Sequence, residues 1–448
     1  MVAVGSGRGN RSHGVMFERD YQQRLEADLA RWQADGVITA SAAESIRGRL
    51  QPVADGITVA TVVAIVGGLL IAAAFLAFIA ANWTAIARPT RFGILLAGIA
   101  GAYVLGALFD RAGRVYLADL AAAVGAIIFG AAIALVGQMY HLGEDFAGGL
   151  LLWAAGALIA AALTTSRGAL AVALAAACLW SGTRVFEASD VHFQFAAFWL
   201  IAAVLAVIWS FPVARHLVAV AAVVGWVLCA FGIEQARAGN PLFAFCAGSS
   251  LMLGAGLAMA ALRQERLRAF GLTLSNYGAI ALAIALACSI IDVNWLRRGL
   301  PIWLIGCGAA GLVLALAGAA LNRRVGTALG GLSIGLALLA VSGWVRPSGL
   351  QEPWVIYALA LGSMLSLVIS GMLDGERPRV AAGWIGLAAV IAAITWAVKG
   401  SLLRRAAFLA AAGIVAVGLA SVLGRLLGNV RGGKERLAKQ RLGEEQAR

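Results

Sequence analysis

The residues best able to do chemistry lie together in one short polar stretch, Gly137–Phe146. It holds an amide, a phenol, an imidazole and two carboxylates, with no lysine or arginine: Gln138, Tyr140, His141, Glu144 and Asp145. A histidine beside two carboxylates is able to bind a divalent cation or to pass protons. On a helix, Gln138 and His141 would share a face, because they are three residues apart. The alternative is a polar loop whose side chains cap helix ends and form hydrogen bonds at a membrane surface.

Two further ionisable residues lie near the ends of apolar segments and are secondary candidates. Asp119 lies two residues inside one such segment, where it is either functional or an interfacial residue that balances Arg114. Arg184 lies near the end of another and is able to extend to the interface or to pair with Glu187. Ionisable residues inside a membrane are rare and usually functional. None lies at the middle of an apolar segment, which argues against a proton- or sodium-coupled pump.

Sequence motifs of the common enzyme classes are absent. There is no nucleotide-binding P-loop, no HExxH, no GxSxG and no DxD pair, and His13, His192 and His216 are isolated in sequence. Five cysteines lack metal-ligand spacing and are interpreted as small buried residues: Cys178, Cys229, Cys246, Cys288 and Cys307. We therefore predict no enzyme, no metal and no other cofactor. An integral membrane enzyme using His141 and Glu144 at the interface stays open as a third hypothesis.

The composition shows what kind of protein must position these groups. Of the 448 residues, 61% are hydrophobic and 13% are charged, whereas soluble domains have about 45–50% apolar and about 25% charged residues. So few charges cannot cover a soluble globule, and so many apolar residues exclude a disordered chain. We predict an all-α fold, a polytopic helical membrane protein with short loops.

Continuous apolar runs give the expected number of membrane spans. A spanning helix needs about 20 apolar residues, and fourteen runs of that kind occur. Those at 168–186, 215–232 and 273–291 are the weakest, so 12 or 13 spans are the alternative. Loops average roughly seven residues, so consecutive helices should be antiparallel neighbours. The runs are 57–80, 92–109, 117–139, 147–164, 168–186, 193–210, 215–232, 241–261, 273–291, 300–321, 326–344, 353–372, 380–398 and 404–424.

Outside the bundle at 57–424, the chain has an N-terminal segment, 1–56, and a basic tail, 425–448. Helical spacing predicts a helical hairpin at 17–50, with a capping box at Ser41–Glu44. Such a hairpin is too small to fold alone. It packs either as a structural cap or as a docking site for a protein partner. The candidate docking residues are Tyr21, Leu25, Leu29 and Trp32.

The distribution of charge predicts orientation and lipid partners. The net charge is +13, and basic residues are concentrated in the two termini. Because basic segments stay on the cytoplasmic side, we expect both termini to be cytoplasmic, in a bacterial inner membrane. The N-terminal segment lacks the apolar core of a signal peptide, so the first span should act as the insertion signal, with Met16 an alternative start. We expect the lipid bilayer as the environment, anionic lipid at the tail, and no nucleic acid.

Glycines recur at helical spacing in two neighbouring runs. Gly326–Gly330 and Gly331–Gly335 are GxxxG steps in one run. Small residues at this spacing let helix backbones approach closely, so we predict tight packing, with a homo-oligomer as the alternative. The preceding run carries a second set: Gly306, Gly308, Gly311 and Gly318.

Three stretches of the first 180 residues resemble a known family. They are Gly36–Thr39, Asn82-Trp83, and Ala134–His141 followed by Leu150–Trp153. On these stretches the chain resembles the uncharacterised bacterial predicted membrane proteins grouped as domain of unknown function 2157. The resemblance implies the membrane class and makes the polar stretch a family feature. It brings no established activity.

Two functional hypotheses follow from the sequence. The first is a transporter- or flippase-like protein for a small or lipidic substrate, with Gln138–Asp145 as its polar site or gate. It depends on the number of spans, the close glycine packing and one acidic loop in a chain whose other loops are basic. The alternative is a non-transporting membrane scaffold or sensor, whose N-terminal hairpin docks a partner.

Overall fold

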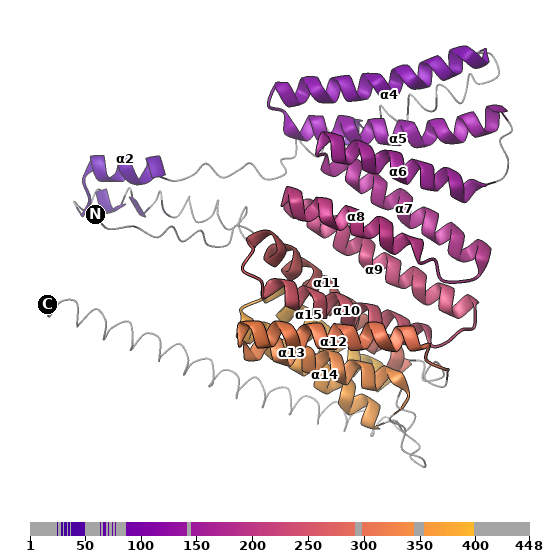
Figure 1. The fold of residues 1–448 in the computed structure, drawn as a ribbon. Coiled ribbons are helices and arrows are strands. Elements are labelled where there is room, and N and C mark those ends of the chain that lie inside the picture. The colour runs from indigo at the N-terminus through magenta and orange to yellow at the C-terminus, as the bar shows by residue number, and fades with distance from the viewer. Residues whose placement is uncertain are drawn as a thin grey trace. The chain divides into compact units, whose positions relative to one another are not determined.

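The computed structural model describes residues 87–140, 145–291, 298–344, 354–397 and 37–49, with scattered positions between 25 and 77. In these ranges every regular element is a helix and no strand occurs, which confirms the all-α prediction (Figure 1). In chain order the helices are α2 (Ala40–Arg49), α4 (Arg88–Arg111), α5 (Val115–Tyr140), α6 (Phe146–Thr164), α7 (Arg167–Ala188), α8 (Gln194–Trp209), α9 (Pro212–Gln235), α10 (Pro241–Ala260), α11 (Glu265–Ile291), α12 (Ile302–Asn322), α13 (Val325–Ser342), α14 (Trp354–Asp374) and α15 (Arg377–Ala397).

The helices from α4 to α15 coincide with predicted apolar runs. Eleven are long and apolar enough to cross a membrane, including those at the three weakest runs. The exception is α8, whose 16 residues fall short of the about 20 that a span needs. The run 404–424 and most of 57–80 lie outside the described residues. The polytopic membrane class is therefore confirmed, and the count of fourteen is not.

The chain divides into two compact units, which are described separately. Unit 1 comprises residues 1–176 with 212–214, and unit 2 comprises 177–211 with 215–448. In unit 1, α5 packs between α4 and α6. The indole Nε1 of Trp153 on α6 donates a hydrogen bond to the carbonyl oxygen of Ala126 on α5, at 2.9 Å. The ring of Trp153 occupies the space beside Gly130 that any larger side chain would fill.

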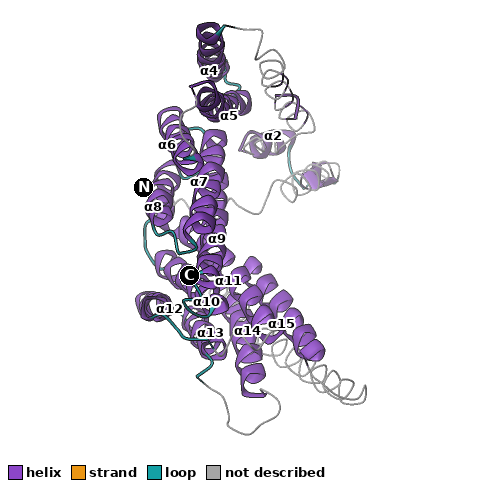
Figure 2. Cartoon of the chain, turned by 90° about the vertical axis from the view of Figure 1, so that its right-hand side faces the viewer, coloured by secondary structure: helices purple, strands orange, loops and turns teal. Residues whose placement is uncertain are grey.

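Unit 2 is built around α10, the most buried of its spans. Helices α11, α12 and α13 pack against α10, while α14 and α15 pack against each other and against α13 and α11, respectively (Figure 2). The contact between α10 and α12 is backbone to backbone: a Cβ atom on Gly254 would lie 1.8 Å from the carbonyl oxygen of Gly311. Glycine is required at this crossing because no side chain fits between the two helices.

Both GxxxG steps of α13 pack within the same chain. A Cβ atom on Gly330 would touch Leu257 of α10 and Ser370 of α14, and one on Gly331 would touch α12. The prediction of tight packing is therefore confirmed for this helix. The cysteine interpretation is confirmed for Cys246, which is buried, and is wrong for Cys288, which is exposed on α11.

Candidate functional site

The polar stretch Gly137–Phe146 is only partly described. Gln138 is exposed near the end of α5. Asp145 is the N-cap residue of α6, where its Oδ1 accepts a hydrogen bond from the backbone N–H of Gly148 at 2.8 Å. The side chain of Tyr140 and all of 141–144, with His141 and Glu144, lie outside the described residues. Cation binding or proton transfer in this stretch therefore stays a prediction.

Asp119 ties α5 to the start of α7 in unit 1. Its Oδ2 lies 2.6 Å from Nε of Arg167, and its Oδ1 accepts a hydrogen bond from the Arg167 backbone N–H at 2.9 Å. The Arg167 guanidinium also lies over the ring of Tyr116. The expected balance with Arg114 was wrong, because the partner comes from another helix. A carboxylate at a helix N-terminus meets unpaired N–H groups and the positive end of the helix dipole, so this contact explains Asp119 structurally.

Arg184 pairs with Glu187 in unit 2, at 3.3 Å. Both side chains are exposed, so the pair adds little stability. His192 lies in the connection between α7 and α8. Its ring lies edge-on to that of Trp180, with centroids 4.4 Å apart, and its Nδ1 lies 3.2 Å from Ser181 Oγ. Burial, and secondly the positive charge of Arg184, lower the pKa of His192.

The lowered pKa of His192 predicts the sign of a pH effect. Protonation is harder in the folded state than in the unfolded chain, where histidine titrates near about 6.5. Its contribution to stability is therefore complete above that pH and is lost as the pH falls. We expect the melting temperature to fall less between about pH 7.5 and 5.5 in His192→Gln than in wild type. Melting curves of both proteins in the same detergent check this, and equal pH dependence would contradict it.

In the N-terminal segment, helix α2 begins at Ala40, two residues earlier than a capping box at Ser41 requires. The Oγ1 of Thr39 accepts a hydrogen bond from the backbone N–H of Ala42 at 3.2 Å, and Ser41 already lies within the helix. The predicted capping box at Ser41 was therefore wrong, and Thr39 is the cap. Among the candidate docking residues, Leu29 is fully buried and Trp32 is exposed. Tyr21 lies outside the described residues.

The sequence analysis missed a buried ion pair in unit 2, at the turn from α14 to α15. Arg379 Nη1 lies 2.8 Å from Asp374 Oδ2, with only 1% of the arginine and 7% of the aspartate side chain exposed. The turn between them is tight, and Gly375 takes a φ of +76° that suits glycine alone. The two charges therefore lie within one helical hairpin.

Polar groups from α14 itself and from two other helices, α11 and α13, surround this pair. Arg379 Nη1 and Nη2 donate to the hydroxyl oxygens of Ser370 and Ser275, at 3.3 and 3.5 Å. Thr327, in the first turn of α13, donates to Asp374 Oδ2 at 3.5 Å. Burying two charges costs several kcal/mol per ion, so such a pair is weak evidence for a purely stabilising role. In a membrane protein, a buried charge is a functional candidate.

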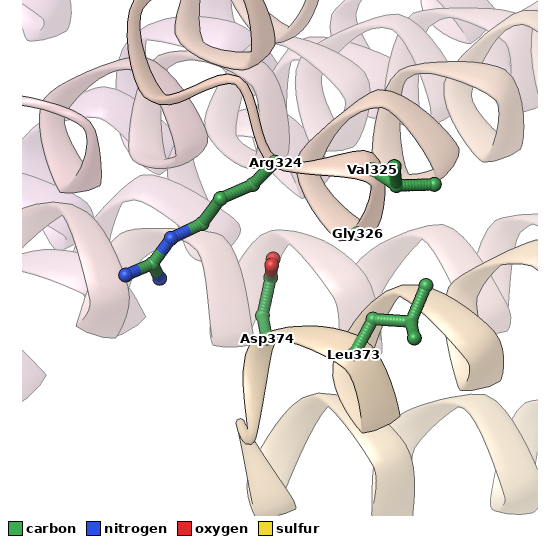
Figure 3. A pocket seen from close by; sticks show the side chains of 5 residues that line it. All are labelled: Arg324, Val325, Gly326, Leu373 and Asp374. Atoms are coloured by element: carbon green, nitrogen blue, oxygen red, sulfur yellow. The ribbon is translucent and has the colours of Figure 1, made fainter. Parts of the chain in front are cut away.

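The ion pair adjoins a hollow between the start of α13 and the end of α14. An open hollow of about 420 Å³ is lined by Arg324, Val325, Gly326, Leu373 and Asp374. Figure 3 shows Arg324 on one side of the Asp374 carboxylate, and Val325 and Leu373 on the other. The hollow is therefore amphipathic, with charge on one side and apolar surface on the other.

A smaller inner pocket shares Arg324 and Asp374 with the hollow and adds Arg268, Glu376 and Arg379 to its lining. The volume of this pocket is about 20 Å³, which accommodates a group the size of one water molecule. The Nε–H of Arg379 is buried and donates to no acceptor in the described part of the protein. A buried donor without an acceptor is uncommon.

One weak signal for this site is present in the sequence. Asp374 and Arg379 fall just outside the predicted runs 353–372 and 380–398, so the sequence predicts a loop between them. The signal was an acidic and a basic residue flanking a glycine turn, with Gly326 and Thr327 opening the preceding helical hairpin. Nothing in the sequence shows that these helix ends meet.

Comparisons with known proteins find a family match for the first part of the chain. Residues 30–170 match the model of a family described as "Predicted membrane protein (DUF2157)". Neither the curated proteins nor the solved structures include a match to the chain. The ion pair and its hollow lie beyond the matched residues, whereas Asp119 and the polar stretch lie within them. The resemblance found in the sequence is therefore confirmed, as a match of residues 30–170 to the model of the predicted membrane proteins DUF2157.

Proposed function

We propose that this protein is a transporter-like or flippase-like membrane protein for a lipidic substrate. The polar head of the substrate would bind at the hollow beside Asp374 and Arg379. The observation that carries the proposal is a buried ion pair that opens onto an amphipathic hollow at the ends of membrane-crossing helices. In this proposal the protein lies in a bacterial inner membrane with both termini cytoplasmic, and it catalyses no chemical reaction.

The lining of the hollow supports a substrate with a polar head and an apolar tail. Arg324 and Asp374 offer charge and hydrogen bonds, while Val325 and Leu373 are 68% and 54% exposed beside them. In a bilayer, exposed apolar side chains at helix ends contact acyl chains, and charged groups contact headgroups. A small polar solute would match only half of this lining. The stretch Gln138–Asp145 stays a second candidate polar site.

The proposal is tested by lipid exchange between leaflets. The purified full chain is reconstituted into vesicles with a fluorescent phospholipid, and a membrane-impermeant reductant reports how fast label reaches the outer leaflet. We expect label to reach the outer leaflet faster in vesicles with the wild-type protein than in protein-free vesicles. A charge-free double variant, Asp374→Asn with Arg379→Met, should slow the exchange about tenfold, a loss of about 1.4 kcal/mol in the transition state.

The control removes a different ion pair of unit 2. Glu234 and Arg298 form an ion pair that is more than one-third exposed, so Glu234→Gln with Arg298→Met should leave the exchange unchanged. If wild type moves lipid no faster than protein-free vesicles do, the proposed function fails. If both double variants slow the exchange equally, the assignment of the site fails.

A further inference from the structure

We propose that the hollow and the inner pocket form a binding site for a phosphate group carried by a phospholipid headgroup, an inference that rests on the proposed function and names its substrate class. The phosphate lies in the hollow beside Arg324, and Arg268 adds positive charge from the lining of the adjoining inner pocket. The apolar part of the lipid lies along Val325 and Leu373. The same phosphate chemistry occurs in free inorganic phosphate, which the experiment below distinguishes.

The first observation is the balance of charge in the lining. Three arginines and two carboxylates line the inner pocket. Arg379 and Asp374 neutralise each other. Within the described ranges, Arg268 and Arg324 form no ion pair. Glu376 offsets one of these two arginines, so the lining has a net positive charge. Guanidinium groups suit phosphate, because their planar N–H donors match its oxygens in pairs.

The second observation concerns N–H donors on two helices that line the site. Arg379 is 1% exposed and lines the inner pocket, yet its Nε–H has no acceptor among the described residues. The start of α13 also faces the hollow, and its N-cap residue, Arg324, makes no capping hydrogen bond through its side chain. The first turn of a helix presents N–H groups and a positive dipole end, both of which favour an anion. The two sets of donors belong to different helices and line adjoining cavities, and the Asp374 carboxylate that pairs with Arg379 lies beside the first turn of α13.

The third observation is the apolar side of the hollow, which distinguishes a phospholipid from free phosphate as the ligand. Free phosphate would use the arginines and the helix N-terminus alone. The apolar side of the hollow, formed by Val325 and Leu373 (Figure 3), adds contact area only for a molecule with a hydrocarbon tail, and each buried CH₂ group contributes about 0.8 kcal/mol. The apolar side therefore favours the phospholipid as the occupant.

The test is a binding titration on the purified full chain in a neutral detergent, with tryptophan fluorescence and melting temperature as readouts. Three probes are compared: a short-chain phosphatidylglycerol, inorganic phosphate, and a short-chain diacylglycerol that lacks phosphate. We expect phosphatidylglycerol to bind at the lowest concentration. Arg324→Gln and Arg268→Gln should each weaken its binding about tenfold. Both side chains are exposed, so the variants should fold, and unchanged melting temperatures without lipid would confirm this.

The matched control is Arg263→Gln, which removes an exposed arginine in the turn between α10 and α11 that lines neither pocket. It should bind phosphatidylglycerol as wild type does. Equal weakening by Arg263→Gln would show general attraction of anionic lipid and would overturn the proposal. Binding of inorganic phosphate as tight as that of phosphatidylglycerol, or equal binding of diacylglycerol, would also overturn it.

The two proposals fail in different ways. If wild type binds phosphatidylglycerol through Arg324 and Arg268 but moves no lipid between leaflets, the phosphate site stands and the transport function fails. If wild type moves lipid while Arg324→Gln and Arg268→Gln leave binding unchanged, the transport function stands and the phosphate site fails.

Discussion

Replacing Arg379 by methionine is expected to lower the free energy of unfolding by about 3–5 kcal/mol, because it leaves the carboxylate of Asp374 buried without its counter-ion. The pair is nearly inaccessible, so solvent cannot take over the charge. Arg379 also donates to Ser370 and Ser275, and these bonds are lost with it. Unfolding in detergent micelles, followed by tryptophan fluorescence, measures the loss.

A second substitution separates charge from packing. Adding Asp374→Asn to Arg379→Met removes the unpaired charge at nearly constant volume, so the double variant should recover most of the lost stability. Replacing both members of a buried pair is often close to neutral, unlike removing one. The coupling energy between the two sites is then obtained from a double-mutant cycle. If the double variant is as unstable as Arg379→Met, the pair does not act through its charge.

The crossing of α10 and α12 gives the second large expected effect. A Cβ atom on Gly311 would lie 2.4 Å from the carbonyl oxygen of Ser250. Backbone atoms cannot move aside as a flexible side chain does, so Gly311→Ala must push the two helices apart. We expect a loss of about 1–3 kcal/mol, the usual effect of overpacking, measured by the same unfolding assay.

Gly306 in the same helix provides the matched control. No atom lies within 4 Å of the position that its Cβ would take. Gly306→Ala should therefore be neutral or stabilising by up to about 1 kcal/mol, because alanine favours a helix more than glycine does. Equal losses at Gly306 and Gly311 would show that helix propensity, rather than the crossing, governs both positions.

These two glycines show which features of the packing a sequence pattern can predict. Both belong to the glycine-rich run that predicted tight packing, and only the structure shows that one faces α10 while the other faces open space. The helices themselves were predictable because a continuous apolar run is a local signal: the run 147–164 and the helix Phe146–Thr164 differ by one residue. Which face of a helix meets a neighbour depends on residues far away in the chain.

The same reason explains the missed site and the corrected partner of Asp119. Sequence proximity suggested Arg114, whereas the partner, Arg167, lies 48 residues away. Ser275 lies 104 residues from Arg379, which donates to it. Asp374 and Arg379 lie just outside the apolar runs 353–372 and 380–398, so the run pattern places them only near the ends of two helices. Their burial depends on how the ends of α11, α13, α14 and α15 meet.

The short turn between α14 and α15 has a consequence for how the chain enters the membrane during synthesis. A buried arginine opposes insertion of a helix into a bilayer, at a cost that depends on its depth. Asp374 precedes Arg379 by only five residues in the same helical hairpin, so the counter-ion is always made first. Helices α14 and α15 can therefore insert together with their charges matched, and no later-made segment is needed to neutralise Arg379.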